Sequence, residues 1–223
     1  MKLKARTIEI LKFFSEVNKK MLFVEGNNLA VASIEGSIIA TAVLPDTITK
    51  EFALYDVSEF LGVYSLFEEA NVEFKDDYIS MSSDTSKNRA KYYYSTKHGI
   101  KNVYDIDVDS KKGEELAKFT LEKYVLDTAK KACSVLSLSD FQVTTSGVKL
   151  LNTESNGMGN EFDLEVKDFE VTNENGLEAE DIVLFFKDMQ FIPDTYYVTI
   201  YENLAYFKSL NGDVAYYVTY KAV

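Results

Sequence analysis

Helical and strand-like spacings of apolar residues alternate along this chain. The first stripe has the i, i+3, i+4, i+7 spacing of a helix with one buried face, and consists of Ile10, Phe13, Phe14 and Val17. At 100° per residue from Ile10, Lys12 and Lys19 fall nearly opposite this stripe. The spacing therefore predicts an amphipathic helix with these two lysines facing away from the core.

Strand-like runs separated by Gly and Asn turn signals follow this helix, at residues 21–25, 29–35, 37–44 and 50–56. Asp56, with Glu59 three residues later, resembles a capping box and predicts the start of a second helix. The apolar stripe of that helix is Val57, Phe60, Leu61, Tyr64 and Phe67. Three further strands are expected, at 72–75, 78–83 and 90–95.

The second half repeats this order after a polar, charged stretch. A helix is predicted at 119–136 with the stripe Leu121, Tyr124, Val125, Thr128, Ala132 and Val135, and Lys123 and Lys130 lie close to 180° from it. Strands follow at 141–146, 148–154 and 161–167, then a helix at 177–191 with the stripe Ile182, Phe185, Phe186 and Met189, then strands at 196–202, 205–210 and 214–220.

This repetition indicates a duplicated α+β architecture. We expect a first domain at 1–96, a connector at 97–116, and a second domain at 117–223, because the middle stretch combines low hydrophobicity with clustered charge.

Charge is segregated along the chain. The net charge is −12, from 24 basic and 36 acidic residues. Residues 1–20 hold six basic against two acidic residues, and residues 118–131 hold four against two, so these segments carry +6 and the remainder −18.

The overall sign argues against nucleic-acid binding, but both predicted first helices are basic in an otherwise acidic chain. Solvation of a helix's polar face is the simpler explanation for either helix alone. The second helices do not share the pattern, because Glu59, Glu180, Asp181 and Asp188 offset Lys187 there.

No catalytic or metal-binding motif is recognisable. His98 lies alone in the expected connector, and Cys133 on the third helix is expected to pack rather than react. The acidic run at 105–109 opens like a calcium loop, but Ser110 and Leu116 occupy the positions where an EF-hand needs Gly and Glu. Residues 157–159 read as a turn, and the scattered carboxylates as an acidic surface. We expect no cofactor, no metal and no enzymatic activity.

A single cysteine excludes an intramolecular disulfide, so a reducing compartment is expected. The N-terminal residues lack the apolar region of a signal peptide, and we expect them to be part of the mature structure. No apolar run approaches the roughly 20 residues of a membrane span, so we expect a soluble protein without a membrane partner.

Two stretches carry a resemblance to a known family. MKL with the first amphipathic helix, followed by ALYDVSEFLGVYSL at 53–66, resembles the sliding clamps of T-even-type bacteriophages, which are polymerase processivity factors. The end of the chain, FFKDMQFIPDTYYVTI at 185–200 with AYF and VAYYVTY after it, is similar to the same clamps and more distantly to proliferating cell nuclear antigen.

The resemblance implies a non-catalytic homotrimeric ring of clamp-type domains, with helices lining a hole around duplex DNA and antiparallel sheets forming the outer wall. Topological enclosure needs only loose, sequence-independent phosphate contacts, which would reconcile DNA binding with the acidic charge. The side chains it places on the DNA-facing lining are Lys4, Arg6, Lys12, Lys19, Lys118, Lys123, Lys130 and Lys131.

The family's subunit contact pairs the last strand of domain one with a strand of the neighbour's domain two. In this sequence the resemblance places that contact at Ala90, Lys91, Tyr92, Tyr93 and Tyr94 and at Glu161, Phe162, Asp163, Leu164 and Glu165. An ordinary outer strand of a monomer is the alternative interpretation of the tyrosine-rich segment.

The resemblance also implies an apolar pocket for partner tails near the connector and the C-terminus. Its residues here would be Val103, Tyr104, Ile106, Phe191, Ile192, Pro193, Tyr217, Val218 and Tyr220. The same residues could equally belong to the core. The partners implied are the polymerase tail, the clamp loader and late-transcription factors, in the cytoplasm of an infected bacterium.

Two other classes of function stay open at this point. One is an oligomeric scaffold of the same duplicated fold that does not bind DNA, for which the lysines would have no salt-dependent role. The other is an enzyme with a composite site, which a perturbed carboxylate pair in a deep pocket would support.

Overall fold

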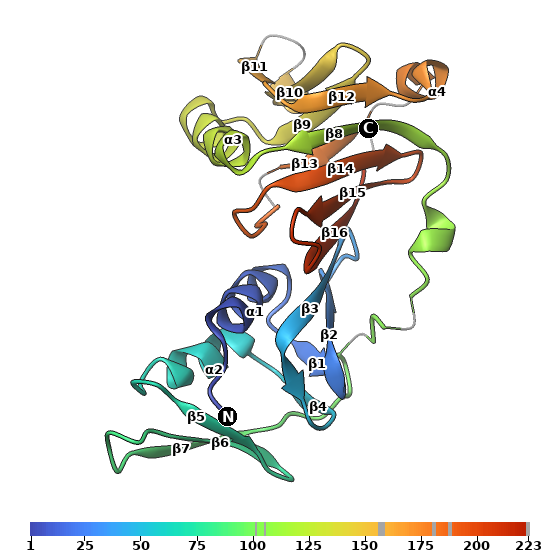
Figure 1. The fold of residues 1–223 in the computed structure, drawn as a ribbon. Coiled ribbons are helices and arrows are strands. Elements are labelled where there is room, and N and C mark those ends of the chain that lie inside the picture. Colours follow the sequence, from blue (N-terminus) through green and yellow to red (C-terminus); the bar gives the residue numbers. More distant parts are fainter. Residues whose placement is uncertain (101, 105, 156–158, 180–181, 187–188, 222–223) are drawn as a thin grey trace. The chain divides into compact units, whose positions relative to one another are not determined.

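The computed structural model describes residues 1–100, 102–104, 106–155, 159–179, 182–186 and 189–221 (Figure 1). The chain divides into two compact units, Met1–Ile106 and Asp107–Val223. The division falls inside residues 97–116, the expected connector. The sequence interpretations of Asp105, of the turn at 157–158, and of the charges at 180–181 and 187–188 lie outside the described residues.

Unit one follows the predicted order of elements. It contains α1 (Ala5–Val17), β1 (Met21–Phe23), β2 (Gly26–Ala32), β3 (Ile38–Ile48), β4 (Phe52–Leu54), α2 (Val57–Tyr64), β5 (Asn71–Phe74), β6 (Tyr78–Ser82) and β7 (Arg89–Tyr93). The strands pair antiparallel as β1 with β4, β2 with β3, and β5–β6–β7.

Helices α1 and α2 lie side by side, and α1 also packs on β3 (Figure 1). Ile10 and Phe14 are fully buried, as the helical spacing predicts, while Lys12 is exposed. The predicted cap of α2 is confirmed, because the Glu59 amide donates to the Asp56 carboxylate at 3.0 Å.

Unit two contains more strands than the sequence pattern predicts. Its elements are the 3₁₀ turn η1 (Asp109–Lys111), β8 (Glu115–Leu121), α3 (Lys123–Leu136), β9 (Asp140–Thr144), β10 (Gly147–Leu151), the 3₁₀ turn η2 (Thr153–Ser155), β11 (Phe162–Leu164), β12 (Lys167–Val171), α4 (Glu174–Ala179), β13 (Val183–Phe185), β14 (Tyr196–Tyr201), β15 (Leu204–Ser209) and β16 (Val214–Thr219). They form the antiparallel sheets β11–β10–β9–β13 and β12–β8–β14–β15–β16.

The predicted start of the helix at residue 119 is wrong. Phe119 and Leu121 belong to β8, where they are buried, and the helix begins only at Lys123. The reason is tertiary, because β8 pairs along its length with β14, which outweighs the helical spacing that these residues share with the following segment.

The predicted helix at 177–191 is also wrong over most of its described part. The helix α4 ends at Ala179, and Val183–Phe185 form β13, paired with β9. A continuous apolar run such as this one can be a buried strand or a buried helix, and spacing alone does not distinguish the two. The decisive factor is the open edge of β9, which supplies backbone partners for a strand.

Candidate nucleic-acid interface and assembly edges

The exposed face of α1 carries one of the predicted DNA-facing lysines, and a second follows the helix. The buried face is formed by Thr7, Ile10, Leu11, Phe14 and Ser15. Lys12 lies on the opposite face, and no ion pair involving it is found among the described residues. Lys19 follows the helix, and its ammonium is 3.6 Å from the carboxylate of Asp56. Glu9 and Glu16 share this face, so its positive charge is modest.

The other two predicted bases of unit one form contacts within the unit. The Lys4 ammonium donates to the carbonyl of Pro45 at 2.7 Å, and the Arg6 guanidinium pairs with Glu9 at 2.8 Å. These contacts are local to the N-terminal end of α1. Of the four predicted bases in unit one, Lys12 is therefore the one whose ammonium forms neither an ion pair nor a hydrogen bond among the described residues.

Helix α3 presents a different face from the one predicted. Its buried residues are Val125, Leu126, Ala129 and Ala132, whereas Tyr124 is 55% exposed and Val135 is 81% exposed. The predicted stripe was counted from Leu121, which lies in the preceding strand, so its phase is rotated. The exposed lysines of α3 are therefore those opposite Val125, Leu126, Ala129 and Ala132.

The four predicted bases of this region have different environments. Lys131 is exposed on α3, and Lys123 forms an ion pair with Asp127 at 3.1 Å on the same helix. Lys118 is not on a helix, because it lies in β8, where it pairs with Glu170 at 3.1 Å. Lys130 is half-buried, and its ammonium donates to the carbonyl of Phe191 at 3.2 Å.

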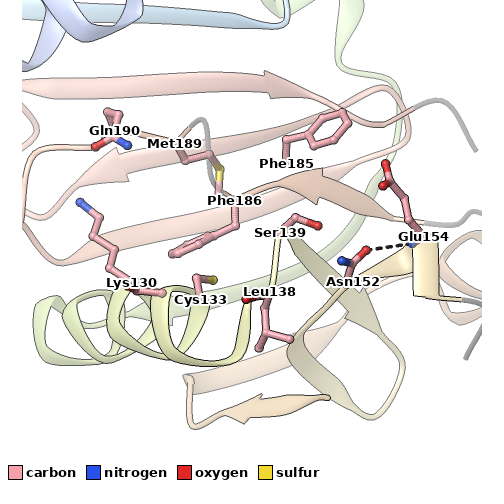
Figure 2. Close-up of a pocket in the computed structure, with 12 residues that line it drawn as sticks. Lys130, Cys133, Leu138, Ser139, Asn152, Glu154, Phe185, Phe186, Met189 and Gln190 are labelled. Carbon is pink, nitrogen blue, oxygen red and sulfur yellow. Dashed lines mark hydrogen bonds between the residues drawn. The ribbon is translucent and has the colours of Figure 1, made fainter. Parts of the chain in front are cut away.

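A cavity of about 840 Å³ opens beside Lys130, between the end of α3 and the segments after β10 and β13 (Figure 2). Its lining combines the apolar Leu138, Phe185, Phe186 and Met189 with Cys133, Asn152, Glu154 and several serines. Burial lowers the pKa of the Lys130 ammonium and raises the pKa of the Cys133 thiol to about 11. A thiol with so high a pKa is a poor nucleophile.

Both predicted contact strands lie at sheet edges. β7 pairs with β6 on one side, β11 pairs with β10 on one side, and no described strand of the chain pairs with the other side of either (Figure 1). Within β7 the side chains alternate between exposed and half-buried, and Tyr93 is 65% exposed. Each unit therefore offers a row of backbone donors and acceptors for another strand.

The residues of the predicted tail pocket have other partners within their own units. In unit one, Val103 is buried against Ala30 and Ala32 of β2, with Tyr104 and Ile106 beside it. The Tyr104 hydroxyl accepts from the Ala30 amide at 3.3 Å and donates to the Leu22 carbonyl at 3.1 Å. These contacts fasten the first part of the expected connector to β1 and β2.

In unit two, three of the predicted pocket residues are core, since Phe191, Ile192 and Val218 are at most 3% exposed. Pro193, Tyr217 and Tyr220 are half-buried, and the Tyr220 hydroxyl donates to the Tyr201 carbonyl. The sequence could not separate these two groups, because buried and half-buried residues are neighbours in the same two apolar segments.

One cluster of side chains in unit two could not be predicted from the sequence pattern. The Lys112 ammonium lies 4.6 Å from the ring centroid of Tyr206, 5.2 Å from that of Tyr201 and 5.6 Å from that of Tyr217, and it pairs with Asp109 at 2.5 Å. Its side chain is only 18% exposed. This cation–π cluster anchors the second part of the expected connector on the sheet.

Neither a metal centre nor a membrane segment emerges from the described part of the chain. It contains no group of three or more His, Cys, Asp or Glu side chains that could hold a metal ion. None of its helices combines the length and the hydrophobicity that crossing a bilayer requires. His98 is exposed in the segment after β7.

The chain has the fold of proliferating cell nuclear antigen. It is similar to the proliferating cell nuclear antigen of Entamoeba histolytica, with a TM-score of 0.67 at 10% sequence identity, over 99% of this chain and 98% of that one. At this level of identity the comparison defines the fold alone.

Sequence comparisons are more specific. The family described as DNA polymerase processivity factor matches residues 3–99. The sliding clamp of Vibrio phage KVP40 is 28% identical over 78% of this chain and 80% of its own length. The sliding clamp of Escherichia phage RB69 is 36% identical, over 38% of this chain and 34% of its own length. Together with the fold, these matches show that the chain is similar to the sliding clamps of T4-like phages, and its first half to the DNA polymerase processivity factor family.

Proposed function

We propose that three copies of this chain close into a ring that encircles duplex DNA and tethers a DNA polymerase to its template without taking part in catalysis. The observation that carries this proposal is that both predicted contact strands, β7 in unit one and β11 in unit two, lie at the edge of a sheet. A protomer with two different open edges can join head to tail, and such an interface closes into a ring when the rotation permits it.

The exposed lysines supply the proposed DNA contact. Lys12 on α1 and Lys131 on α3 occupy the first helix of their respective units and are exposed. Contacts of this kind would be loose and independent of sequence, which suits a protein that must slide. Lys19 and Lys123 add charge that is partly offset by their ion pairs with acidic residues.

The proposed partners are duplex DNA, two further copies of the chain, the terminal segment of a polymerase, a clamp loader and late-transcription factors, all in the cytoplasm of an infected bacterium. In unit two, the half-buried Tyr217 and Tyr220 are the part of the predicted pocket that we propose for the contact with a polymerase segment.

A threading assay tests encirclement without a loader. A linear duplex is incubated with the protein at high concentration, its ends are then blocked with streptavidin, and the complex is washed at high salt. We expect the protein to be retained on this DNA, to be absent when the ends are blocked before the protein is added, and to be released when a restriction enzyme cuts the blocked DNA.

Three results would each exclude encirclement in a distinct way. Equal retention regardless of the order of blocking would indicate ordinary surface binding. Retention after cutting would indicate the same. No retention at all, from a protein that nevertheless forms oligomers, would favour the alternative of a scaffold that does not bind DNA.

A further inference from the structure

Unit two contains a buried aspartate that none of the sites described above uses. Asp140 is the first residue of β9 and is 0% exposed. One oxygen of its carboxylate, Oδ2, accepts from the Thr153 amide at 2.9 Å and from the Thr153 hydroxyl at 2.7 Å. The other oxygen, Oδ1, is buried without a hydrogen-bond partner among the described residues. A carboxylate in this position depends on a nearby positive charge, because burial penalises its ionised form.

Lys221 supplies this charge. Its ammonium lies 3.5 Å from Oδ2 of Asp140 and donates to the Thr153 hydroxyl at 3.0 Å. Among the described residues, Lys221 is the only base that pairs with Asp140. Only 15% of the Lys221 side chain is exposed, so salt screens this pair less than it screens a pair on the surface. The buried carboxylate and the segment that carries Lys221 are thus held together by one ion pair.

Further contacts hold the same lysine. The Lys221 amide donates to the Val183 carbonyl at 2.8 Å, and the ammonium lies 4.6 Å from the centroid of the Phe185 ring. Val183 and Phe185 belong to β13, which pairs with β9. The Glu154 carboxylate, 3.7 Å from the ammonium, is exposed and adds a weaker contact. Both the backbone and the side chain of Lys221 are therefore fastened to the sheet β11–β10–β9–β13.

These contacts join the two sheets of unit two. β16 is part of the sheet β12–β8–β14–β15–β16 and ends at Thr219. Two residues later, the chain is bound to β13 and β9 of the other sheet. We call this set of contacts the clasp, and its members are Asp140, Thr153, Val183, Phe185 and Lys221.

Tyr220 lies between β16 and the clasp. Its hydroxyl donates to the Tyr201 carbonyl of β14, and its neighbour Lys221 is bound to β13. Tyr217, within β16, packs its ring on that of Tyr206 with 4.8 Å between the centroids. Tyr217 and Tyr220 are both half-buried. A segment that is already fixed in place pays less conformational entropy when a partner binds to it.

We propose that Lys221 is a positioning residue, and that its buried ion pair with Asp140 holds residues 217–221 in the conformation that a polymerase segment contacts. Lys221 acts through Tyr217 and Tyr220 and not by touching the polymerase. This inference rests on the polymerase contact proposed above for these two tyrosines, and it adds the interaction that keeps them in place.

Removing one charge of the clasp differs from removing both. Lys221→Met leaves the buried Asp140 carboxylate without a base, which is costly for the fold. Asp140→Asn keeps an oxygen that can accept from Thr153 and leaves Lys221 beside the exposed Glu154. The double variant, Asp140→Asn with Lys221→Met, has neither the buried charge nor the ion pair. It therefore separates the stability of unit two from the position of residues 217–221.

A polymerase titration tests the positioning role. Primer extension is followed on primed circular DNA onto which a matching loader has placed the protein, while the concentration of a matching polymerase is varied. We expect the double variant to raise the polymerase concentration at half-maximal extension by about fivefold or more, with the same plateau, because the contact is no longer preorganised. Lys221→Arg should stay within about twofold of the wild type, because a guanidinium keeps the charge and the donors.

Hydrogen exchange gives a readout that does not involve the polymerase. We expect the amides of residues 217–221 to exchange about tenfold faster in the double variant than in the wild type, because the segment opens locally. Urea unfolding measures the stability of each variant, and the double variant carries the test by itself if Lys221→Met does not fold. Lys208→Met is the matched control, since Lys208 is exposed on β15 of the same sheet and forms no ion pair among the described residues.

The possible failures are distinguishable. Unchanged polymerase affinity in a double variant whose residues 217–221 exchange faster would show that the clasp is structural only, and unchanged exchange would show that it does not hold this segment. Either result overturns the inference. If Tyr217→Ala combined with Tyr220→Ala threads onto DNA and binds the polymerase normally, the contact proposed for these tyrosines is wrong and the inference fails with it, while encirclement stands. A wild type that does not thread would overturn the proposed function in an assay that does not depend on the clasp.

Discussion

Single side chains fasten the segment after β7 to its unit, and Tyr104 is the clearest case. Its hydroxyl joins the expected connector to β1 and β2 through contacts to Leu22 and Ala30. Burial raises the pKa of this hydroxyl to about 12. A tyrosine with a raised pKa in the folded state stabilises the fold below its unfolded pKa of about 10, and this contribution is lost as the pH rises toward 12.

The substitution Tyr104→Phe should therefore change the alkaline stability profile. At neutral pH we expect a loss of about 1 kcal/mol in the free energy of unfolding, from the missing hydrogen bonds. Between about pH 10 and 12 the variant should lose stability less steeply than the wild type, because one shifted proton is absent. Urea unfolding across this pH range measures both effects.

Tyr55→Phe is the control, since Tyr55 is 64% exposed and also lies in unit one. A Tyr104→Phe profile parallel to that of the wild type at alkaline pH would show that the hydroxyl is not protected from ionisation.

At the scale of elements, an aspartate on β3 caps a helix that has no cap of its own. Lys4 is the N-cap residue of α1 and makes no side-chain cap. The Asp46 carboxylate, only 6% exposed, instead accepts from the Lys4 amide at 2.7 Å and from the Thr7 hydroxyl at 2.7 Å. This contact joins the start of α1 to β3 and so helps to position the lysine-bearing face.

Asp46→Ala should reduce the free energy of unfolding of unit one by about 1–2 kcal/mol, because two donors lose their acceptor at a helix start. Thermal or urea denaturation followed by circular dichroism measures this, with the exposed Asp77→Ala as the matched control. Equal stability of the two variants would mean that water replaces the carboxylate at no cost.

At the scale of the whole molecule, charge is distributed in keeping with a sliding role. The chain carries −12 overall, while exposed lysines remain on the first helix of each unit. In the ring proposed above, a weak positive lining would hold DNA loosely, and the acidic exterior would discourage binding at other faces.

The pair Lys12→Glu and Lys131→Glu should lower processivity several-fold while self-association is unchanged, because both lysines are exposed on helices and lie outside the edge strands. Primer extension with a matching polymerase and loader measures processivity, and sedimentation velocity measures association. Lys208→Glu controls for the added negative charge.

Unaltered processivity of the double variant on a loaded template would assign the DNA contact to other residues. Loss of association would instead show that these helices contribute to the subunit contact.

The sequence by itself determined the order of elements in unit one, because short-range rules suffice there. The stripe containing Ile10 and Phe14, the Asp56 cap and the strand at β7 follow from spacing, capping and alternation. The resemblance of residues 53–66 to phage clamps also pointed to the class that the comparisons support.

Only the tertiary structure decided the phase of α3, the strand identity of 183–185, and which charges remain uncompensated. Phe119 and Val183 become strand residues because β14 and β9 offer them backbone partners that are distant in sequence. Lys118 is neutralised by Glu170 and Lys130 is half-buried beside Phe191, both remote in sequence, whereas Lys12 and Lys131 stay exposed. Pairing between remote segments outweighs local spacing, and local spacing is all that a pattern in one sequence records.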